Sequence, residues 1–232
     1  MEPTPTPRPH PSPDAPLVTV HGEAHHEVDP ETARIQITVN ARGTDRRAAL
    51  ADLTTRNQRA LDLVKSYGEA IEKLETGSFS ITPQLTTKGR HERVSAYHGT
   101  VRTTVTVADF TALGELTTRL ADLDLTTVTG PWWALRPNSP AHRDARRQAV
   151  HDAVRRAREY ADALGARLVA LLELADQDAD TGGPLPRAAG TMRSARFAGP
   201  DDDTPAALDL EPQRQSVYAQ VSARFTITRP EL

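Results

Sequence analysis

Cysteine is absent from the 232 residues of the chain. The protein therefore has no disulfide, no thiolate metal ligand and no cysteine nucleophile. Long apolar runs are missing as well: no stretch approaches the roughly 20 apolar residues that cross a bilayer, and the N-terminus lacks the run of about 7–15 apolar residues that marks a signal peptide. As written, the sequence predicts a cytoplasmic protein without a membrane span.

Strong charge and catalytic signatures are also missing. The formal net charge is -3 and the pI is about 6.2, which argues against nucleic acid as a partner. The chain contains no G-x-S-x-G elbow, phosphate loop, G-x-G-x-x-G fingerprint or H-E-x-x-H motif. We therefore predict no catalytic residues, no cofactor and no enzymatic activity.

Proline and small polar residues mark the segments that do not fold. Residues 1–16 are rich in proline and nearly free of apolar side chains, so a disordered, extended tail is expected. Residues 177–215 are rich in Asp, Gly, Pro and Ala and show no sustained apolar period, which indicates a mobile insertion. The rest, residues 17–228, is predicted to form a single domain.

Hydrophobic periodicity gives the elements of this domain. Clean alternation over residues 32–41 and 217–227 predicts long strands with one buried face. Apolar spacing of three and four predicts helices over residues 45–67, 109–120 and 139–164. Further strands are expected at residues 17–28, 71–76, 78–87, 94–107, 123–135 and 167–174. This order predicts an α+β fold, with a mixed, largely antiparallel sheet and three helices packed on it.

The third predicted helix carries a stripe of small residues. Alanines recur every fourth position, at Ala145, Ala149, Ala153, Ala157 and Ala161. Side chains this small let the helix axis approach a sheet more closely than leucines would. The arginines of the same helix alternate with acidic residues, which is typical of a solvated face with ion pairs.

Two local groups of residues are candidate sites. His21 and His25, with His26 beside them, are possible metal ligands. They are weak candidates, because adjacent residues on a strand point to opposite faces and Gly22 interrupts the pattern. Trp132 and Trp133 are the candidate interface residues: one is expected in the core and the other on the opposite side of the strand, where tryptophan is a frequent interface anchor.

Several segments together resemble a known family. The opening VTVHGEAHHEVDPETARIQITVNARG, the segments GSFSITPQ and SAYHGTVRTTVTV, the helix DARRQAVHDAVRRAREYADALGARL and the final strand VYAQVSARFTI occur in the order seen in SIMPL-domain proteins. The usual Pro-Asp turn is written Asp29-Pro30 here. The resemblance implies a bacterial α+β protein of unknown function, often homo-oligomeric, with periplasmic or secreted relatives linked to envelope or stress physiology. It implies no agreed catalytic residues.

Three functional hypotheses follow. The favoured one is a non-catalytic, self-associating binding or assembly module without a nucleic-acid partner, whose small-molecule ligand is unknown. The second is a metal-dependent or hydrolytic enzyme that uses the N-terminal histidines. The third is an adaptor that binds peptides along a strand edge.

Overall fold

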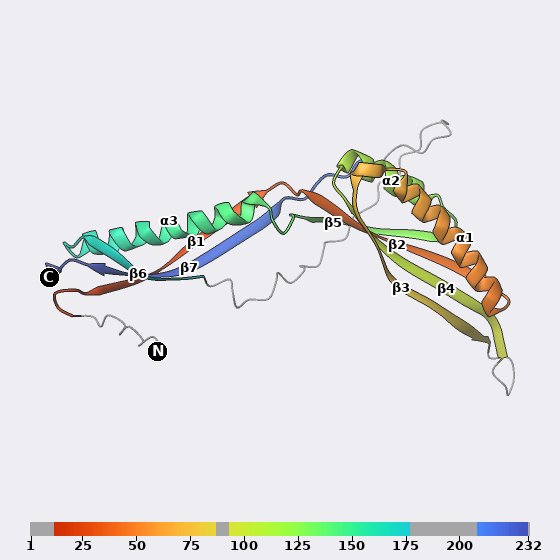
Figure 1. Ribbon diagram of the computed structural model, residues 1–232, viewed down its shortest axis with the longest axis horizontal. Coiled ribbons are helices and arrows are strands. Elements are labelled where there is room, and N and C mark those ends of the chain that lie inside the picture. Colours follow the sequence, from red (N-terminus) through yellow and green to blue (C-terminus); the bar gives the residue numbers. More distant parts are fainter. Residues whose placement is uncertain (1–11, 87–92, 177–207, 232) are drawn as a thin grey trace, which may run out of the picture. The chain divides into compact units, whose positions relative to one another are not determined.

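The computed structural model describes residues 12–86, 93–176 and 208–231. In these ranges the chain forms three α-helices and seven strands in two antiparallel sheets, which confirms the α+β class (Figure 1). The residues expected in a single domain divide into two compact units, each with its own sheet. We call them the central unit, which contains β2 to β5 with α1 and α2, and the terminal unit, which contains β1, β6 and β7 with α3.

The central unit follows the order βαββαβ. Its sheet has the strand order β3-β4-β2-β5 and every neighbouring pair is antiparallel, the ferredoxin-like arrangement. Its elements are β2 (Thr32–Gly43), α1 (Arg46–Lys65), a 3₁₀ turn at Gly68–Ala70, β3 (Ile71–Thr86), β4 (Arg93–Val107), α2 (Phe110–Ala121) and β5 (Thr126–Ala134).

Two strands predicted at residues 71–76 and 78–87 are in fact one. Gly77 does not end the strand, because β3 continues through it with a shift of register between Thr76 and Ser78. Such a shift is a β-bulge, which a glycine accommodates easily. The result is a strand of 16 residues at one edge of the sheet.

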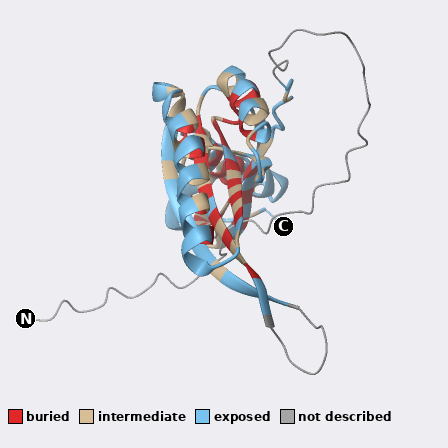
Figure 2. Ribbon diagram, turned by 90° about the vertical axis from the view of Figure 1, so that its right-hand side faces the viewer, coloured by how far each residue is buried: buried red, intermediate tan, exposed pale blue. Residues whose placement is uncertain are grey.

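Each helix of the central unit begins after an aspartate that caps it. Asp45 accepts a hydrogen bond from the N–H of Ala48, and Asp109 accepts one from the N–H of Thr111, both at 2.9 Å. Both helices cover the same face of the sheet, and the buried side chains lie between them and the strands (Figure 2). The largest fully buried side chains of this core include Ile35, Ile37, Leu53, Leu113, Leu116 and Leu120.

The last residues of the predicted insertion lie against the central unit. The N–H of Leu208 donates to the hydroxyl of Thr118 at 3.1 Å, and Leu210 packs on the core. Residues 177–207, and residues 1–11 of the predicted tail, are outside the described ranges.

The terminal unit is a three-stranded sheet with the order β1-β7-β6 and one helix. Ser139 accepts a hydrogen bond from the N–H of Ala141, and Pro140 occupies the first helical position. The helix lies along β1 and β7 (Figure 1). The elements are β1 (Leu17–Val28), α3 (Pro140–Ala163), β6 (Leu168–Asp176) and β7 (Gln215–Ile227).

The alanine stripe of α3 is fully buried, as the sequence predicted. Its counterpart on the sheet is Gly22 of β1. A Cβ atom at that position would lie only 2.0 Å from the carbonyl oxygen of Ala149 and 2.5 Å from the backbone nitrogen of Ala153. The helix backbone therefore rests directly on the strand, and only glycine fits beneath it.

Candidate functional site

The N-terminal histidines are not brought together. β1 runs without interruption through Gly22, so His21 and His25 lie on the same exposed face. Their Cα atoms are four positions apart along the strand, a distance of about 13 Å. This is too far for both imidazoles to bind one metal ion. Nε2 of His25 is 2.9 Å from the hydroxyl of Ser216, and His26 lies on the face that α3 covers. In residues 12–86, 93–176 and 208–231, no group of three or more His, Cys, Asp or Glu is placed to hold a metal ion.

The two tryptophans occupy opposite sides of β5, as alternation predicted. Trp133 packs on the core, edge-to-face with Phe110 at a centroid distance of 4.8 Å. Trp132 is 43% exposed, with the Arg34 guanidinium 5.8 Å from the centre of its ring. Only Trp132 is therefore accessible for the predicted interface role, and that role stays a prediction.

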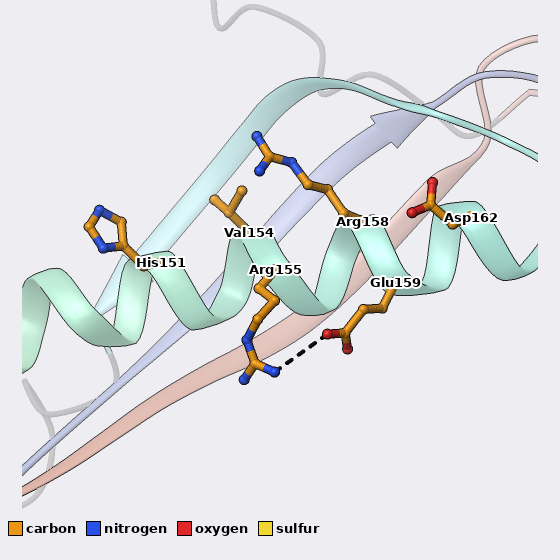
Figure 3. A pocket seen from close by; sticks show the side chains of 6 residues that line it. All are labelled: His151, Val154, Arg155, Arg158, Glu159 and Asp162. Atoms are coloured by element: carbon orange, nitrogen blue, oxygen red, sulfur yellow. Dashed lines mark hydrogen bonds and ion pairs between the residues drawn. The ribbon is translucent and has the colours of Figure 1, made fainter.

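A depression of about 390 Å³ lies on the surface of α3. All six lining residues come from this one helix: His151, Val154, Arg155, Arg158, Glu159 and Asp162 (Figure 3). Arg155 is paired with Glu159 at 3.4 Å. Side chains on a single helix cannot surround a ligand, so this depression does not provide the converging groups that a catalytic site requires.

The outer edge of β1 is occupied by side chains of α3. The N–H of Glu23 donates to Oδ2 of Asp152 at 3.2 Å. Arg156 bridges the two acids, at 2.8 Å to Asp152 and 2.7 Å to Glu23, and Arg155 also binds Asp152. Burial opposes ionisation of Asp152, but the Glu23 N–H and the two guanidinium groups outweigh it and lower its pKa. The middle of this edge is therefore closed to another strand.

Both edges of the central sheet also carry features that block pairing. Pro83 interrupts the backbone donors of β3, and that strand has three register shifts. Pro131 does the same for β5, next to a register shift opposite Arg34. Proline and bulges are the usual means by which natural sheets avoid edge-to-edge association.

The outer edge of β6 has two register shifts, between Leu168 and Ala170 and between Leu171 and Glu173, but it lacks the prolines of the central sheet edges. Among the described strands, β6 pairs only with β7. It contains no proline, lysine or arginine, and apart from Glu173 and Asp176 every residue is apolar. Its large side chains are nevertheless exposed: Val169 is 62%, Leu171 52% and Leu174 47% exposed. Such a strand is a template for a further strand, so it is the candidate functional site.

The composition of β6 distinguishes it from the other strands. A strand that is apolar at nearly every position is typical of a sheet covered on both faces, and LVALLELAD has this character. The prediction located the strand but not its edge position, because strand order depends on pairing with the distant β7.

Comparison with known proteins agrees with the resemblance seen in the sequence. The family described as "SIMPL: Protein of unknown function (DUF541)" matches residues 18–225, which include segments of both units. Two curated proteins, each named "26 kDa periplasmic immunogenic protein", are similar to the chain. They come from Brucella melitensis biotype 1 and Brucella abortus strain S19, and each is 24% identical over 196 residues, covering 82% of this chain and 78% of the relative.

The comparisons also concern the expected location of the protein. The names of the Brucella proteins agree with the implication that relatives are periplasmic, but they give no support to a cytoplasmic location for this chain. Among the helices of the described residues, none combines the length and apolar character that a membrane crossing requires. Because the family match extends over most of the sequence, the chain belongs to the SIMPL family of proteins of unknown function.

Proposed function

We propose that this protein is a self-associating assembly module whose subunits join through β6. The observation that carries the proposal is the exposure of an almost wholly apolar strand that, among the described strands, pairs on one side only. Burying a leucine or valine side chain completely contributes about 1.5–3 kcal/mol. Since these side chains are about half exposed, each has roughly half of that free energy left to gain in an interface.

A second copy of the chain is the occupant that fits this edge. An edge strand can pair antiparallel with the same strand of a second copy around a twofold axis, because both copies then use the same surface. Such pairing gives partners to the outward N–H and C=O groups of β6 and extends the three-stranded sheet into one of six. Prolines in β3 and β5 and the contact of Asp152 with β1 have no counterpart in β6 among the described residues, which supports β6 as the edge used.

The molar mass of the purified protein tests the proposal. Size-exclusion chromatography with light scattering, over a range of concentrations, is expected to give a multiple of the 25.3 kDa chain mass. The variant Leu171→Lys places a charge in the middle of the exposed strand, where pairing would bury it. We expect this variant to shift toward 25.3 kDa at concentrations where the wild type is assembled.

Leu50→Lys is the matched control. Leu50 is 44% exposed, comparable with Leu171, but lies on α1 in the central unit. It should leave the mass unchanged, and circular dichroism should show that both variants are folded. A wild type that is monomeric at every concentration contradicts self-association. A Leu171→Lys variant that assembles as the wild type does contradicts the role of β6.

A further inference from the structure

Among the described residues, no helix covers the face of the central sheet opposite α1 and α2. On the two middle strands, β2 and β4, the outward side chains are hydroxyls, amides, one histidine and arginines, with no acidic residue among them. Asn40 and Thr100 are hydrogen-bonded to each other across the strands at 3.0 Å. This is therefore an ordered polar surface.

Three arginines form a line across this surface, and we call them, together with Trp132, the basic face. Arg34 and Arg42 lie on β2, and Arg102 of β4 is opposite Thr38, midway between them. At about 3.3 Å per residue, neighbouring arginines are separated by about 13 Å along the strands. All three are exposed, and among the described residues none of the three guanidinium groups is within ion-pair distance of a carboxylate.

Trp132 lies at one end of this line. It is opposite Arg34 in the register of β2 and β5, and the guanidinium lies 5.8 Å from the centre of the ring. An exposed indole beside a cation presents an apolar surface next to a charge. The C–H groups of a sugar ring pack on such a surface, while the cation holds an acidic substituent.

We propose that the basic face binds a linear acidic polysaccharide. Its carboxylates would pair with Arg34, Arg102 and Arg42 in turn, its hydroxyls would hydrogen-bond to the amides and hydroxyls between them, and one ring would pack on Trp132. Charge complementarity carries the choice of ligand: cations in a row, without acidic neighbours on the middle strands, fit a polymer with repeated negative charge.

Single-stranded nucleic acid is also a polyanion, but it fits this surface less well. Proteins that bind it without sequence preference stack successive bases on several aromatic side chains. Among the described residues of this face, Trp132 is the single aromatic platform, since Trp133 and Phe110 pack on the buried side.

Calorimetric titration of the full-length protein with oligogalacturonate tests the proposal. The wild type is expected to bind it, with an affinity that falls as salt is added. Arg102→Gln is expected to weaken binding at least fivefold, because it removes the middle charge, and Trp132→Ala is expected to weaken it as well. Both side chains are exposed, so the variants should fold as the wild type does.

Arg147→Gln is the matched control, since it removes an equally exposed positive charge from α3 in the terminal unit. It is expected to leave the affinity unchanged. The proposal is overturned if the wild type shows no binding up to millimolar ligand, or if Arg147→Gln weakens binding as much as Arg102→Gln. It is also overturned if a neutral cello-oligosaccharide binds equally well, or if oligo(dT) binds more tightly. The proposal does not rest on self-association, because Leu171→Lys should leave the affinity of each basic face for a short oligogalacturonate intact.

Discussion

The hydroxyl of Thr103 lies inside the core of the central unit without a hydrogen-bond partner among the described residues. Thr103 is 3% exposed and sits between Val101 and Val105 on the buried face of β4, opposite Ile37. A buried polar group without a partner costs about 1–3 kcal/mol of stability. We therefore expect Thr103→Val, which keeps the shape and removes the hydroxyl, to raise the free energy of unfolding by about 1 kcal/mol.

Urea denaturation followed by circular dichroism measures this change. Thr104→Val is the control, because Thr104 is the next residue on the same strand and points to the uncovered face. It is expected to change the free energy of unfolding by less than about 0.5 kcal/mol. If Thr103→Val lowers the stability instead, the hydroxyl has a partner, such as an ordered water, and the cost assigned to it here is wrong.

The two tryptophans of β5 show how far alternation along a strand predicts the position of single side chains. Alternation along a strand requires Trp132 and Trp133 to face opposite sides, and this was confirmed. It does not say which side is buried. That depends on Phe110 of α2, which packs on Trp133, and on the absence of a helix from the other face.

At the scale of elements, the packing of α3 on β1 depends on a pair of matched surfaces. The alanine stripe of α3 was visible in the sequence, but its partner Gly22 was interpreted as a break in the strand. The Gly22→Ala variant would place a methyl group 2.0 Å from the carbonyl oxygen of Ala149. Since backbone cannot yield locally, the helix must move away from the sheet. We expect a loss of about 3 kcal/mol in the free energy of unfolding.

Gly77→Ala provides the comparison for this prediction. A methyl group at Gly77 would meet no atom nearer than 3.7 Å, so this variant is expected to unfold at nearly the wild-type urea concentration. Equal midpoints for the two variants would show that α3 does not rest on β1 as closely as the structure places it.

Periodicity predicted most elements because it is a local property of the chain. The caps at Asp45, Asp109 and Ser139 were equally visible, since each depends on residues two or three positions away. Gly77 shows the limit: a bulge and a break look alike in sequence, and only the pairing with β4 distinguishes them. The edge position of β6 was likewise beyond local patterns, because it depends on strand pairing: among the described strands, only β7 pairs with β6.

At the scale of the whole molecule, the division into two units was not predicted. β1 and β2 follow one another with only the Asp29-Pro30 turn between them, and both alternate as half-buried strands do. They nevertheless join different sheets, since β2 pairs with β4 and β5 whereas β1 lies beside β7. These partners are distant in sequence, and hydrophobic pattern alone does not choose among them.

The two units place the proposed activities on different surfaces of the chain. Self-association is assigned to β6 in the terminal unit, and polysaccharide binding to the basic face of the central unit. Assembly would then multiply the number of binding faces, and several weak contacts on one polymer give a higher avidity than any single contact. Leu171→Lys and Arg102→Gln separate the two activities, because each acts on one unit only.

Acid is expected to weaken the whole protein through the terminal unit. Asp152 is buried, accepts a hydrogen bond from the N–H of Glu23 and forms ion pairs with the guanidinium groups of Arg155 and Arg156. Its pKa in the folded protein lies below the ordinary value, so folding favours the ionised form. The stability that this carboxylate contributes is complete at neutral pH and is lost as the pH falls below about 4 and approaches the folded pKa.

The Asp152→Asn variant isolates this contribution. At pH 7 it is expected to be less stable than the wild type by about 2–3 kcal/mol, because it leaves two guanidinium groups without their buried anion. The difference should shrink as the pH is lowered from 5 to 3, since the wild-type carboxyl then becomes protonated too. Urea midpoints at each pH, followed by circular dichroism at 222 nm, measure this difference.

The control variant Asp52→Asn removes the more exposed partner of Arg56 on α1 and is expected to lower the free energy of unfolding by less than about 1 kcal/mol. A difference between wild type and Asp152→Asn that stays constant from pH 7 to pH 3 would show that the ionised carboxylate does not hold α3 to β1.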